Sequence, residues 1–517
     1  MTAFESGDRP ETHDVTATTE AAAGLAGAAQ AAAAKGGAAK GGALSAAASQ
    51  GRRRTKIVAT LGPASREERV LGLLLEAGMD VARINLAHGN TAEHAASIAA
   101  VRRAAVERGA PLAVLVDLPG PKLRLADLPR PLEVKAGDTV VLGAPPGAQL
   151  PVNFPELLPH FSPGELVLID DGAVELRVSA VAPPTVTLEV LNDGVIESRK
   201  GVNLPDTHLP IGALTPADRE LLSWSLRQDV DYVALSFVRG AGDVRELKEL
   251  IAAAGGDQLV VAKIEKKEAL SAYEEIIAAA DAVMVARGDL GVEISPAMVP
   301  IWQKRIIHAA NLAGKPVITA TQLLQSMVSS PRPTRAEASD VANAIYDATS
   351  AVMLSGETAI GCYPAEAVRT MAGIALVVEA DIEREGRAQQ PWPAARTGVS
   401  TAISYGACDV AHRVGAAAIV SATFSGATAR AVARNLPAQP IVAVSPNQRV
   451  VNQLTLCWGV SPLLGRHPGS FEEVLHEAND LVLANGFGRP GQVVVVTAGL
   501  QTNQSGTTNL IKAHVLA

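Results

Sequence analysis

Eight short apolar runs, separated by longer stretches with helical spacing, constrain the fold of this chain most strongly. Each run is largely apolar on both faces, which is typical of parallel strands covered by helices. The segments between them, such as 67–77, 243–253 and 300–313, have the periodicity of helices. Eight strand–helix pairs predict an α/β fold, a (β/α)8 TIM barrel. The predicted strands are 56–60, 81–86, 112–117, 231–237, 259–264, 282–286, 316–320 and 351–354.

The gap between the third and fourth runs is too long for one helix. Its residues alternate with period two at 165–170, 173–181 and 185–190, and Asp-Gly or Asn-Asp-Gly turns interrupt them. We therefore predict a small β-barrel lid domain inserted into a loop at the catalytic face. The barrel would then be discontinuous, comprising residues 51–120 and 211–385, with the lid at 121–210.

A second α/β pattern begins after a Pro- and Gln-containing linker near 389–393. It predicts a separate C-terminal open-sheet α/β domain, residues 386–517. Its predicted strands are 417–423, 440–445, 460–464 and 492–497.

The first fifty residues differ in composition from the rest of the chain. Residues 21–50 are almost all Ala, Gly and Ser, with two lysines, Lys35 and Lys40. Glycines interrupt the helical tendency of alanine, and no apolar stripe exists to dock a helix. We predict a disordered or partly helical tail at 1–50, with a functional tail as the alternative.

Composition excludes several classes of function. A net charge of −8 over 517 residues shows no broad basic field, and 3% aromatic residues offer few stacking platforms, so we expect no nucleic-acid partner. Three scattered cysteines, Cys362, Cys408 and Cys457, argue against a disulfide framework or structural zinc. Because no apolar run could span a bilayer and the first residues are polar, we expect no membrane association and a cytoplasmic location.

Polar side chains gather where the predicted strands end, which is where TIM-barrel enzymes build their sites. Lys263 and Glu265 are two residues apart on a strand and therefore face the same side. They could form a structural ion pair, or Glu265 could share a magnesium ion with Asp289. The strand-end residues are Arg83, Asn85 and His88; Asp117 and Arg124; Lys263 and Glu265; Arg287, Gly288 and Asp289; Thr319 and Thr321; and Ser355 to Glu357.

Fixed positive charge around a metal is what phosphoryl transfer requires, because its transition state spreads negative charge over the equatorial oxygens. Arg83, Arg124 and Lys263 would supply that charge. The turn at 288–291 precedes a short helical segment, so its amides could hold a carboxylate or phosphate, or it could be a plain βα turn. The residues alone thus predict a metal-assisted, anion-handling barrel enzyme.

Several long motifs run in order from residue 56 to the carboxyl end. They are KIVATLGPAS at 56–65, ARINLAHG at 82–89, KGVNLP at 200–205, KIE at 263–265, MVARGDLG at 284–291, KPVITATQLLQSM at 315–327, PRPTRAEASDVANA at 331–344, MLSGETA at 353–359 and TTN near 507. These motifs, in this order, resemble those of the pyruvate kinase family, and the TTN segment resembles the family's last strand region. The resemblance implies a barrel, a lid after its third strand, a regulatory C-terminal domain and a homotetramer. It also implies transfer of the phosphoryl group of phosphoenolpyruvate to ADP, giving pyruvate and ATP.

The same resemblance implies a role for each matching residue. Glu265 and Asp289 match magnesium ligands, with manganese as a second metal, and Lys263 and Arg83 match the residues that contact the phosphoryl group. The remaining matches are Thr321, near the enol face and implicated in protonation through water; Gly288, with Asp289, in substrate binding; His88, Arg124 and Lys200 in nucleotide binding; and Asn85 and Asp117 at monovalent-cation positions.

Three positions depart from the potassium-dependent members of the family. Ala87 and Leu118 stand where those members have hydroxyl residues, and Lys122 stands where they have Glu. Since an ammonium can supply the positive charge of potassium, we predict activity without potassium, with Lys122 as the surrogate. The alternative is a solvated hinge lysine.

A segment of the C-terminal domain resembles the family's sugar-phosphate effector loop. Thr423, Ser425 and Thr428 match it, and hydroxyls and amides at a helix start suit a phosphate. Phe424 and Ala427 are unusual there, and the loop at 501–506 lacks an Arg or Trp for a second phosphate. We therefore expect a phosphorylated effector. Fructose 1,6-bisphosphate fits this segment poorly, and AMP or a sugar monophosphate is an equally good candidate.

Two other functions remain open at this point. A different phosphoenolpyruvate or pyruvate barrel enzyme, such as a lyase, would need neither lid nor C-terminal domain, and dependence on ADP would distinguish it. A non-catalytic regulatory paralogue would typically have lost a metal ligand or the lysine. The residues that such a paralogue tends to lose are all present: Lys263, Glu265, Asp289, Thr321 and Arg83.

Overall fold

A computed structural model describes residues 52–144, 148–207, 209–385, 398–499 and 508–517. The predicted tail at 1–50, with Lys35 and Lys40, the linker at 389–393 and the loop at 501–506 lie outside the described residues. Among the described residues, no helix is both long and apolar enough to cross a membrane.

Eight parallel strands close into a barrel, as predicted. Neighbouring strands pair in parallel all the way round, and β1 closes the ring against β16. The fourth strand is shorter than predicted because Phe237 has a φ of 57°, which takes the chain out of the extended conformation. The strands, in ring order, are β1 (Lys56–Leu61), β2 (Val81–Asn85), β3 (Ala113–Leu118), β12 (Tyr232–Leu235), β13 (Leu259–Ile264), β14 (Ala282–Ala286), β15 (Val317–Ala320) and β16 (Ala351–Leu354).

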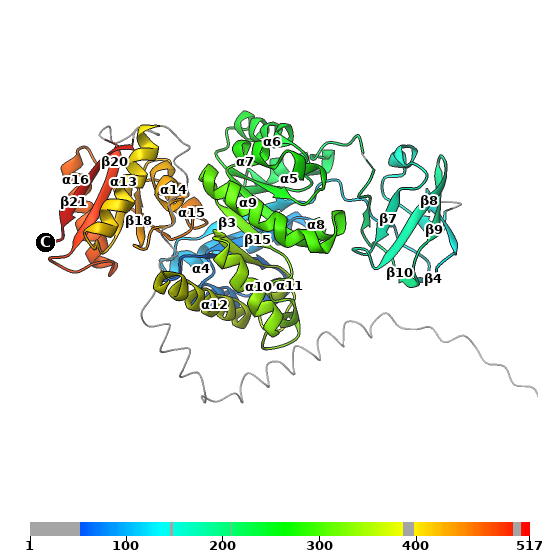
Figure 1. Cartoon of the computed structure of the whole chain (residues 1–517), viewed down its shortest axis with the longest axis horizontal. Coiled ribbons are helices and arrows are strands. Elements are labelled where there is room, and N and C mark those ends of the chain that lie inside the picture. The colour runs from blue at the N-terminus through cyan, green and yellow to red at the C-terminus, as the bar shows by residue number, and fades with distance from the viewer. Residues whose placement is uncertain (1–51, 145–147, 208, 386–397, 500–507) are drawn as a thin grey trace, which may run out of the picture. The chain divides into compact units, whose positions relative to one another are not determined.

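Helices follow the barrel strands (Figure 1). Capping boxes begin two of them, at Thr215 and Thr334, where the side-chain hydroxyl accepts a hydrogen bond from a first-turn amide. The α-helices are α3 (Glu68–Ala77), α4 (Thr91–Glu107), α5 (Pro216–Ser225), α6 (Ala241–Ala253), α7 (Tyr273–Ala279), α8 (Arg287–Glu293), α9 (Val299–Ala313), α10 (Arg335–Tyr346), α11 (Gly356–Ala359) and α12 (Pro364–Arg384). Short 3-10 helices are η1 (Pro63–Ser65), η3 (Glu268–Ser271), η4 (Pro296–Met298) and η5 (Gln325–Val328).

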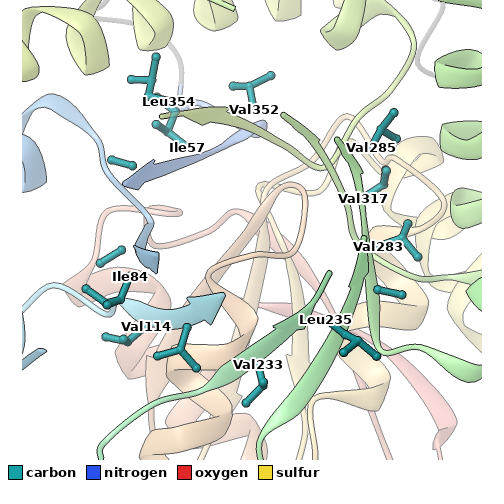
Figure 2. Close-up of a cluster of buried hydrophobic side chains, with 14 of the residues drawn as sticks. Ile57, Ile84, Val114, Val233, Leu235, Val283, Val285, Val317, Val352 and Leu354 are labelled. Atoms are coloured by element: carbon teal, nitrogen blue, oxygen red, sulfur yellow. The ribbon is translucent and has the colours of Figure 1, made fainter. Parts of the chain in front are cut away.

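Alternate strand residues supply two separate apolar cores. Ile57 and Val114 belong to the large core that also includes buried helix side chains, and Figure 2 shows such residues around the ring of strands. Val58, between Ile57 and Ala59, belongs instead to the inner cluster. This alternation is why each barrel strand is apolar on both faces, the pattern from which the barrel was predicted.

Leu456, from the C-terminal part of the chain, is completely buried in the inner cluster of the barrel. Two barrel side chains donate hydrogen bonds to backbone carbonyls on either side of Leu456 in the sequence. The Tyr232 hydroxyl donates to Gln453 O at 2.6 Å, and the Lys56 ammonium donates to Val460 O at 2.7 Å. Tyr232 and Lys56 are each the first residue of their strand. The segment around Leu456 therefore packs against the amino ends of the barrel strands.

An all-β insertion follows β3, as predicted. A six-stranded sheet runs in the order β11-β7-β8-β9-β5-β6, and β4 and β10 form a separate antiparallel pair. Buried Val, Leu and Ile side chains give this insertion an apolar core of its own. The elements are β4 (Leu132–Val134), β5 (Thr139–Gly143), β6 (Leu150–Pro151), η2 (Pro155–His160), β7 (Leu166–Ile169), β8 (Val174–Ala182), β9 (Thr185–Val190), β10 (Gly194–Ile196) and β11 (Val202–Asn203).

The C-terminal part of the chain is an open α/β sheet in the order β19-β18-β17-β20-β21. The four predicted strands are present, and β21 adds an antiparallel edge that the strand pattern did not predict. The elements are α13 (Val399–Arg413), β17 (Ile419–Ala422), α14 (Ala427–Ala433), β18 (Ile441–Ser445), α15 (Gln448–Leu454), β19 (Val460–Leu464), α16 (Phe471–Ala484), β20 (Val493–Gly499) and β21 (Thr508–Val515).

Candidate active site

The carboxyl ends of six neighbouring barrel strands carry the candidate site residues. Because parallel strands end on the same side of a barrel, residues far apart in the sequence meet there. In ring order they are Arg83 and Asn85 in β2, Asp117 in β3, Ser236 after β12, Lys263 and Glu265 at the end of β13, Asp289 in the helix after β14, and Thr321 after β15.

Two cations and two carboxylates form one largely buried cluster. Arg83 Nη2 lies 2.7 Å from Asp117 Oδ2, and Lys263 Nζ lies 3.5 Å from Asp117 Oδ1. The Lys263 ammonium also lies 3.3 Å from Glu265 Oε2 and donates a hydrogen bond to Ser236 Oγ at 2.7 Å. Asp117 therefore joins the two cations and holds them side by side.

Two residues of this cluster were missed by the sequence analysis. Thr60 Oγ1 accepts a hydrogen bond from Arg83 Nη1 at 3.0 Å, and Ser236 orients the Lys263 ammonium. Both lie within or beside predicted strands, and Thr60 is part of the first family motif. Their polarity in otherwise apolar runs was a further signal in the sequence.

The charges at the strand ends shift one another's pKa. Burial would raise the pKa of Asp117, but the charges of Lys263 and Arg83 outweigh it and hold that pKa below its ordinary value. Burial likewise opposes the charge on Lys263, yet Asp117, Glu265 and Asp289 raise its pKa. Lys263 is therefore a permanent cation at neutral pH.

Glu265 differs from the other acids in this cluster. Burial, with the nearby charge of Asp289, raises its pKa to about 7, although Lys263 opposes the shift. Its Oε1 accepts a hydrogen bond from the Phe237 amide at 2.8 Å, while its buried Oε2 has no hydrogen-bond partner among the described residues. A buried carboxylate oxygen left without a hydrogen bond is the kind of donor that a hard divalent cation fits.

Asp289 is paired with a lysine from the start of the inserted segment. Lys122 Nζ lies 2.8 Å from Asp289 Oδ1, and the two side chains are 22% and 27% exposed. Burial would raise the pKa of Asp289, but Lys122 and Lys263 outweigh it and lower that pKa. Lys122 is thus an ion-paired residue of the site rather than a freely solvated one, and its partner is the predicted metal ligand.

Thr321 and Gly288 contact each other across β14 and β15. The Gly288 amide donates a hydrogen bond to Thr321 Oγ1 at 2.7 Å, and that hydroxyl donates in turn to Ala320 O at 2.7 Å. The expectation of a turn preceding a helix was wrong in detail, because α8 begins at Arg287 and already includes Gly288 and Asp289. The first turn of this helix therefore contacts Thr321 in the candidate site.

The predicted nucleotide residues are less tightly connected to the cluster. Burial, and then the charges of Arg124 and Arg83, lower the pKa of His88, so its imidazole is neutral at pH 7. Lys200 lies 3.0 Å from Asp170 Oδ2 and 3.1 Å from Glu197 Oε2, both in the inserted segment. Asn85, which was predicted at a monovalent-cation position, accepts a hydrogen bond through Oδ1 from the Ala87 amide at 3.2 Å.

The predicted effector residues lie at the start of α14, in the C-terminal sheet. Thr428 Oγ1 is buried and lies 2.6 Å from Thr508 Oγ1, while Ser425 O accepts a hydrogen bond from Arg430 Nη2 at 2.8 Å. Thr423 is also buried. The Thr428 hydroxyl therefore already has one partner within the sheet.

A (β/α)8 barrel with paired cations and buried acids at its strand ends belongs to the class of anion-handling barrel enzymes. Comparison with known families is more specific. Residues 52–368 match "Pyruvate kinase, barrel domain" and residues 401–514 match "Pyruvate kinase, alpha/beta domain". The chain belongs to the pyruvate kinase family.

Individual relatives agree with this assignment. A pyruvate kinase of Geobacillus stearothermophilus is 44% identical over 476 residues, which cover 90% of this chain and 81% of the relative. "Pyruvate kinase 2" of Synechocystis sp. is 45% identical over 473 residues, covering 90% and 79%. A pyruvate kinase of Clostridium acetobutylicum is 40% identical over 471 residues, covering 90% and 100%.

These comparisons establish an enzyme of the pyruvate kinase type, which transfers a phosphoryl group between phosphoenolpyruvate and ADP. They support neither the lyase nor the non-catalytic alternative. The family generally requires a divalent metal, in agreement with the buried Glu265 oxygen that accepts no hydrogen bond.

Proposed function

We propose that this chain transfers the phosphoryl group at the carboxyl ends of its barrel strands, with Lys263 and Arg83 as the catalytic residues that hold it. The observation that carries this proposal is the buried cluster in which Asp117 holds both cations side by side. Two fixed, desolvated cations suit a reacting group whose negative charge is spread over several oxygens.

The transfer is an in-line displacement at phosphorus. An oxygen of the terminal ADP phosphate forms a new P–O bond while the bond to the enol oxygen of phosphoenolpyruvate breaks, and the electron pair of that bond leaves with the enolate. Lys263 and Arg83 stabilise the charge on the phosphoryl oxygens during this step. The raised pKa of Lys263 keeps its ammonium charged throughout.

We propose Glu265 and Asp289 as the ligands of magnesium, with manganese as a substitute. Glu265 Oε2, which accepts no hydrogen bond although Lys263 Nζ lies 3.3 Å away, and the adjacent negative charge of Asp289 fit a hard cation. A bound divalent cation would neutralise charge on the substrate oxygens and on the enolate. Among the described residues, no group of three or more His, Cys, Asp and Glu could form a complete protein cage, so substrate oxygens and water would supply the other ligands.

Thr321 is proposed to complete the reaction by guiding protonation of the enolate through water, and Gly288 with Asp289 to line the substrate. A proton from solvent bonds to the methylene carbon, the enolate electron pair forms that C–H bond, and the carbonyl of pyruvate is restored. The hydroxyl of Thr321 lies next to the Gly288 amide, in the first turn of α8.

The nucleotide is proposed to contact His88, Arg124 and Lys200. Arg124 and Lys200 belong to the inserted β segment, so that segment would serve as the lid that closes over ADP and excludes water. The ammonium of Lys200 would exchange its contacts with Asp170 and Glu197 for phosphate oxygens.

We propose that potassium is not required. The ammonium of Lys122 supplies a positive charge close to Asp289, and Ala87 and Leu118 remove two hydroxyls from the region of Asn85 and Asp117. Asp117 is also occupied by Arg83 and Lys263, which favours a site that carries its own cations.

Regulation and assembly are proposed from family membership. Thr423, Ser425 and Thr428 would contact a phosphorylated effector at the start of α14, and the chain would assemble as a homotetramer. The domain division predicted above, with residues 121–210 as lid and 386–517 as regulatory domain, and a cytoplasmic location are proposed on the same basis.

The test is the initial rate of pyruvate formation from phosphoenolpyruvate and ADP with magnesium, in sodium buffer and again with added potassium. We expect turnover in sodium, none without ADP, and less than about a twofold increase with potassium. Turnover confined to potassium would refute the Lys122 proposal alone. Pyruvate release at the same rate without ADP would overturn the assigned reaction.

A further inference from the structure

Thr321 and Gln322 have backbone conformations that L-residues rarely adopt. Their φ angles are 70° and 55°, both in the left-handed region, directly after β15. A β-branched residue such as Thr is particularly disfavoured there. Since two consecutive residues hold this conformation beside the candidate site, surrounding groups must fix it.

Arg287, the first residue of α8, provides the main contacts to this strained segment. Its Nη2 donates a hydrogen bond to Thr321 O at 2.8 Å, and its Nε donates to Ala320 O at 3.2 Å. Strands β14 and β15 pair with Ala286 opposite Ala320. Arg287 follows β14 and Thr321 follows β15, so these two residues lie side by side. The Arg287 guanidinium thus holds the two backbone carbonyls that flank the Cα of Thr321, those of Ala320 and Thr321.

Arg287 is itself fixed by residues from two further helices. Asp340 of α10 accepts two parallel hydrogen bonds from the guanidinium, each 2.7 Å long, and Gln303 of α9 accepts a third at 3.2 Å. The Arg287 side chain is only 12% exposed. A bidentate pair of this geometry requires the planar fork of arginine, which the single ammonium of lysine cannot reproduce.

We infer that Arg287, held by Asp340, is a positioning residue that fixes Thr321 for the proton transfer to the enolate. This inference rests on the role of Thr321 in the proposed function. Arg287 exchanges no proton and bonds to no reacting atom: its hydrogen bonds to Ala320 and Thr321 keep the Thr321 hydroxyl in place. Without them, the segment would relax from its left-handed conformation and the hydroxyl would move.

Two readouts test the inference: kcat and KM for pyruvate formation from phosphoenolpyruvate, and the rate at which the methyl group of pyruvate takes up deuterium from solvent in the presence of magnesium and ATP. We expect Arg287→Met to lower both kcat and deuterium uptake about 100-fold, as a misplaced reacting group does, while KM for phosphoenolpyruvate changes less than about threefold. Arg287→Lys and Asp340→Asn, which keep part of the network, should give smaller losses of both rates.

Arg102 offers a matched control. Its side chain is 15% exposed, it lies 2.6 Å from Asp231 Oδ2, and it donates hydrogen bonds to Leu112 O and Asp229 O, near the amino ends of the barrel strands. Arg102→Met therefore removes a comparable network far along the strands from Thr321. We expect it to lower stability without lowering deuterium uptake per folded molecule. Equal losses of uptake in Arg287→Met and Arg102→Met would overturn the inference.

The Thr321→Ala variant separates this inference from the proposed function. Normal deuterium uptake in Thr321→Ala would overturn the proposed role of Thr321 and the inference with it. Loss of uptake in Thr321→Ala but not in Arg287→Met would overturn the inference alone. If Arg287 acts through Thr321, adding Arg287→Met to Thr321→Ala should cause no further loss of uptake, and a full additional loss would contradict it. Should Arg287→Met not fold, Asp340→Asn and Arg287→Lys provide the same comparison.

Discussion

The ammonium of Lys122 lies 2.8 Å from the carboxylate of Asp289, joining the first residues of the inserted segment to the first turn of α8. The two residues are 167 positions apart in the sequence. Their contact places a built-in cation on a residue proposed to bind the divalent metal. It also lowers the pKa of Asp289 and keeps that carboxylate ionised.

Removing the Lys122 charge should create a requirement for potassium. We expect Lys122→Met to lose at least about tenfold in kcat in sodium buffer, because the positive charge beside Asp289 is lost, and to regain part of it with potassium. Lys135→Met, at an exposed position of the insertion, is the control and should behave like the parent enzyme. An unchanged rate of Lys122→Met in sodium would show that Lys122 is not the surrogate.

Loss of the Glu265 carboxylate should abolish stabilisation by metal. A cation that binds only the folded enzyme stabilises it by about 2.7 kcal/mol at 100 times its dissociation constant. We expect magnesium or manganese to raise the thermal midpoint of the parent enzyme and of Glu275→Gln, an exposed control, but not of Glu265→Gln. Since Glu265 has a pKa of about 7, protons should compete with the metal as pH falls below 7, and the stabilisation should shrink there. A full metal response in Glu265→Gln would exclude this residue as a ligand.

Thiol reactivity should distinguish the three cysteines. Burial raises the pKa of Cys408 to about 12 and that of Cys457 to about 11, so at pH 8 their thiolate fractions are about 10⁻⁴ and 10⁻³. Cys362 is exposed. We expect a thiol reagent to modify one cysteine quickly in the native enzyme and all three after denaturation, with Cys408 and Cys457 reacting faster only as pH rises toward 11. Rapid reaction of all three in the native enzyme would contradict this assignment.

Leu456 should contribute to the free energy of unfolding, although it lies outside the chain segments that form the barrel strands. Leu456→Ala removes a completely buried side chain from the inner barrel cluster, and such a cavity costs about 2–5 kcal/mol. Leu464→Ala, at a residue that is 53% exposed, is the control and should have little effect. The measurement is the midpoint of urea unfolding followed by circular dichroism. Equal midpoints for the two variants would mean that Leu456 does not support the barrel.

Much of the fold could be predicted because its signals are local. Runs such as 282–286 are apolar on both faces, and the position of Lys263 and Glu265 at the end of one run already indicated a site. The β21 strand was absent from the predicted apolar pattern because it is an edge strand with polar residues, such as Lys512 and His514, along its length. Only the resemblance of the TTN segment near 507 to the family's last strand region indicated it.

The rest of the site depends on contacts between distant residues, which no local pattern contains. Arg287 was noted in the sequence only as a residue after a strand, and its pairing with Asp340, 53 positions away, appears only once α8 and α10 are placed. The same holds for Ser236, which contacts Lys263 because β12 and β13 are neighbours in the ring. The left-handed conformation of Thr321 likewise has no signature in a motif that lacks glycine at that position.

The most direct test of the account is the rate of pyruvate formation by Lys263→Met, with magnesium, phosphoenolpyruvate and ADP at saturation. Lys267→Met, an exposed lysine four positions along the chain, is the control. If Lys263 holds the transferring phosphoryl group, its replacement should lower kcat by about 10²–10³-fold or more, while Lys267→Met stays within about twofold of the parent enzyme. A folded Lys263→Met variant that retains more than about a tenth of the parent kcat would contradict the central role assigned to this residue.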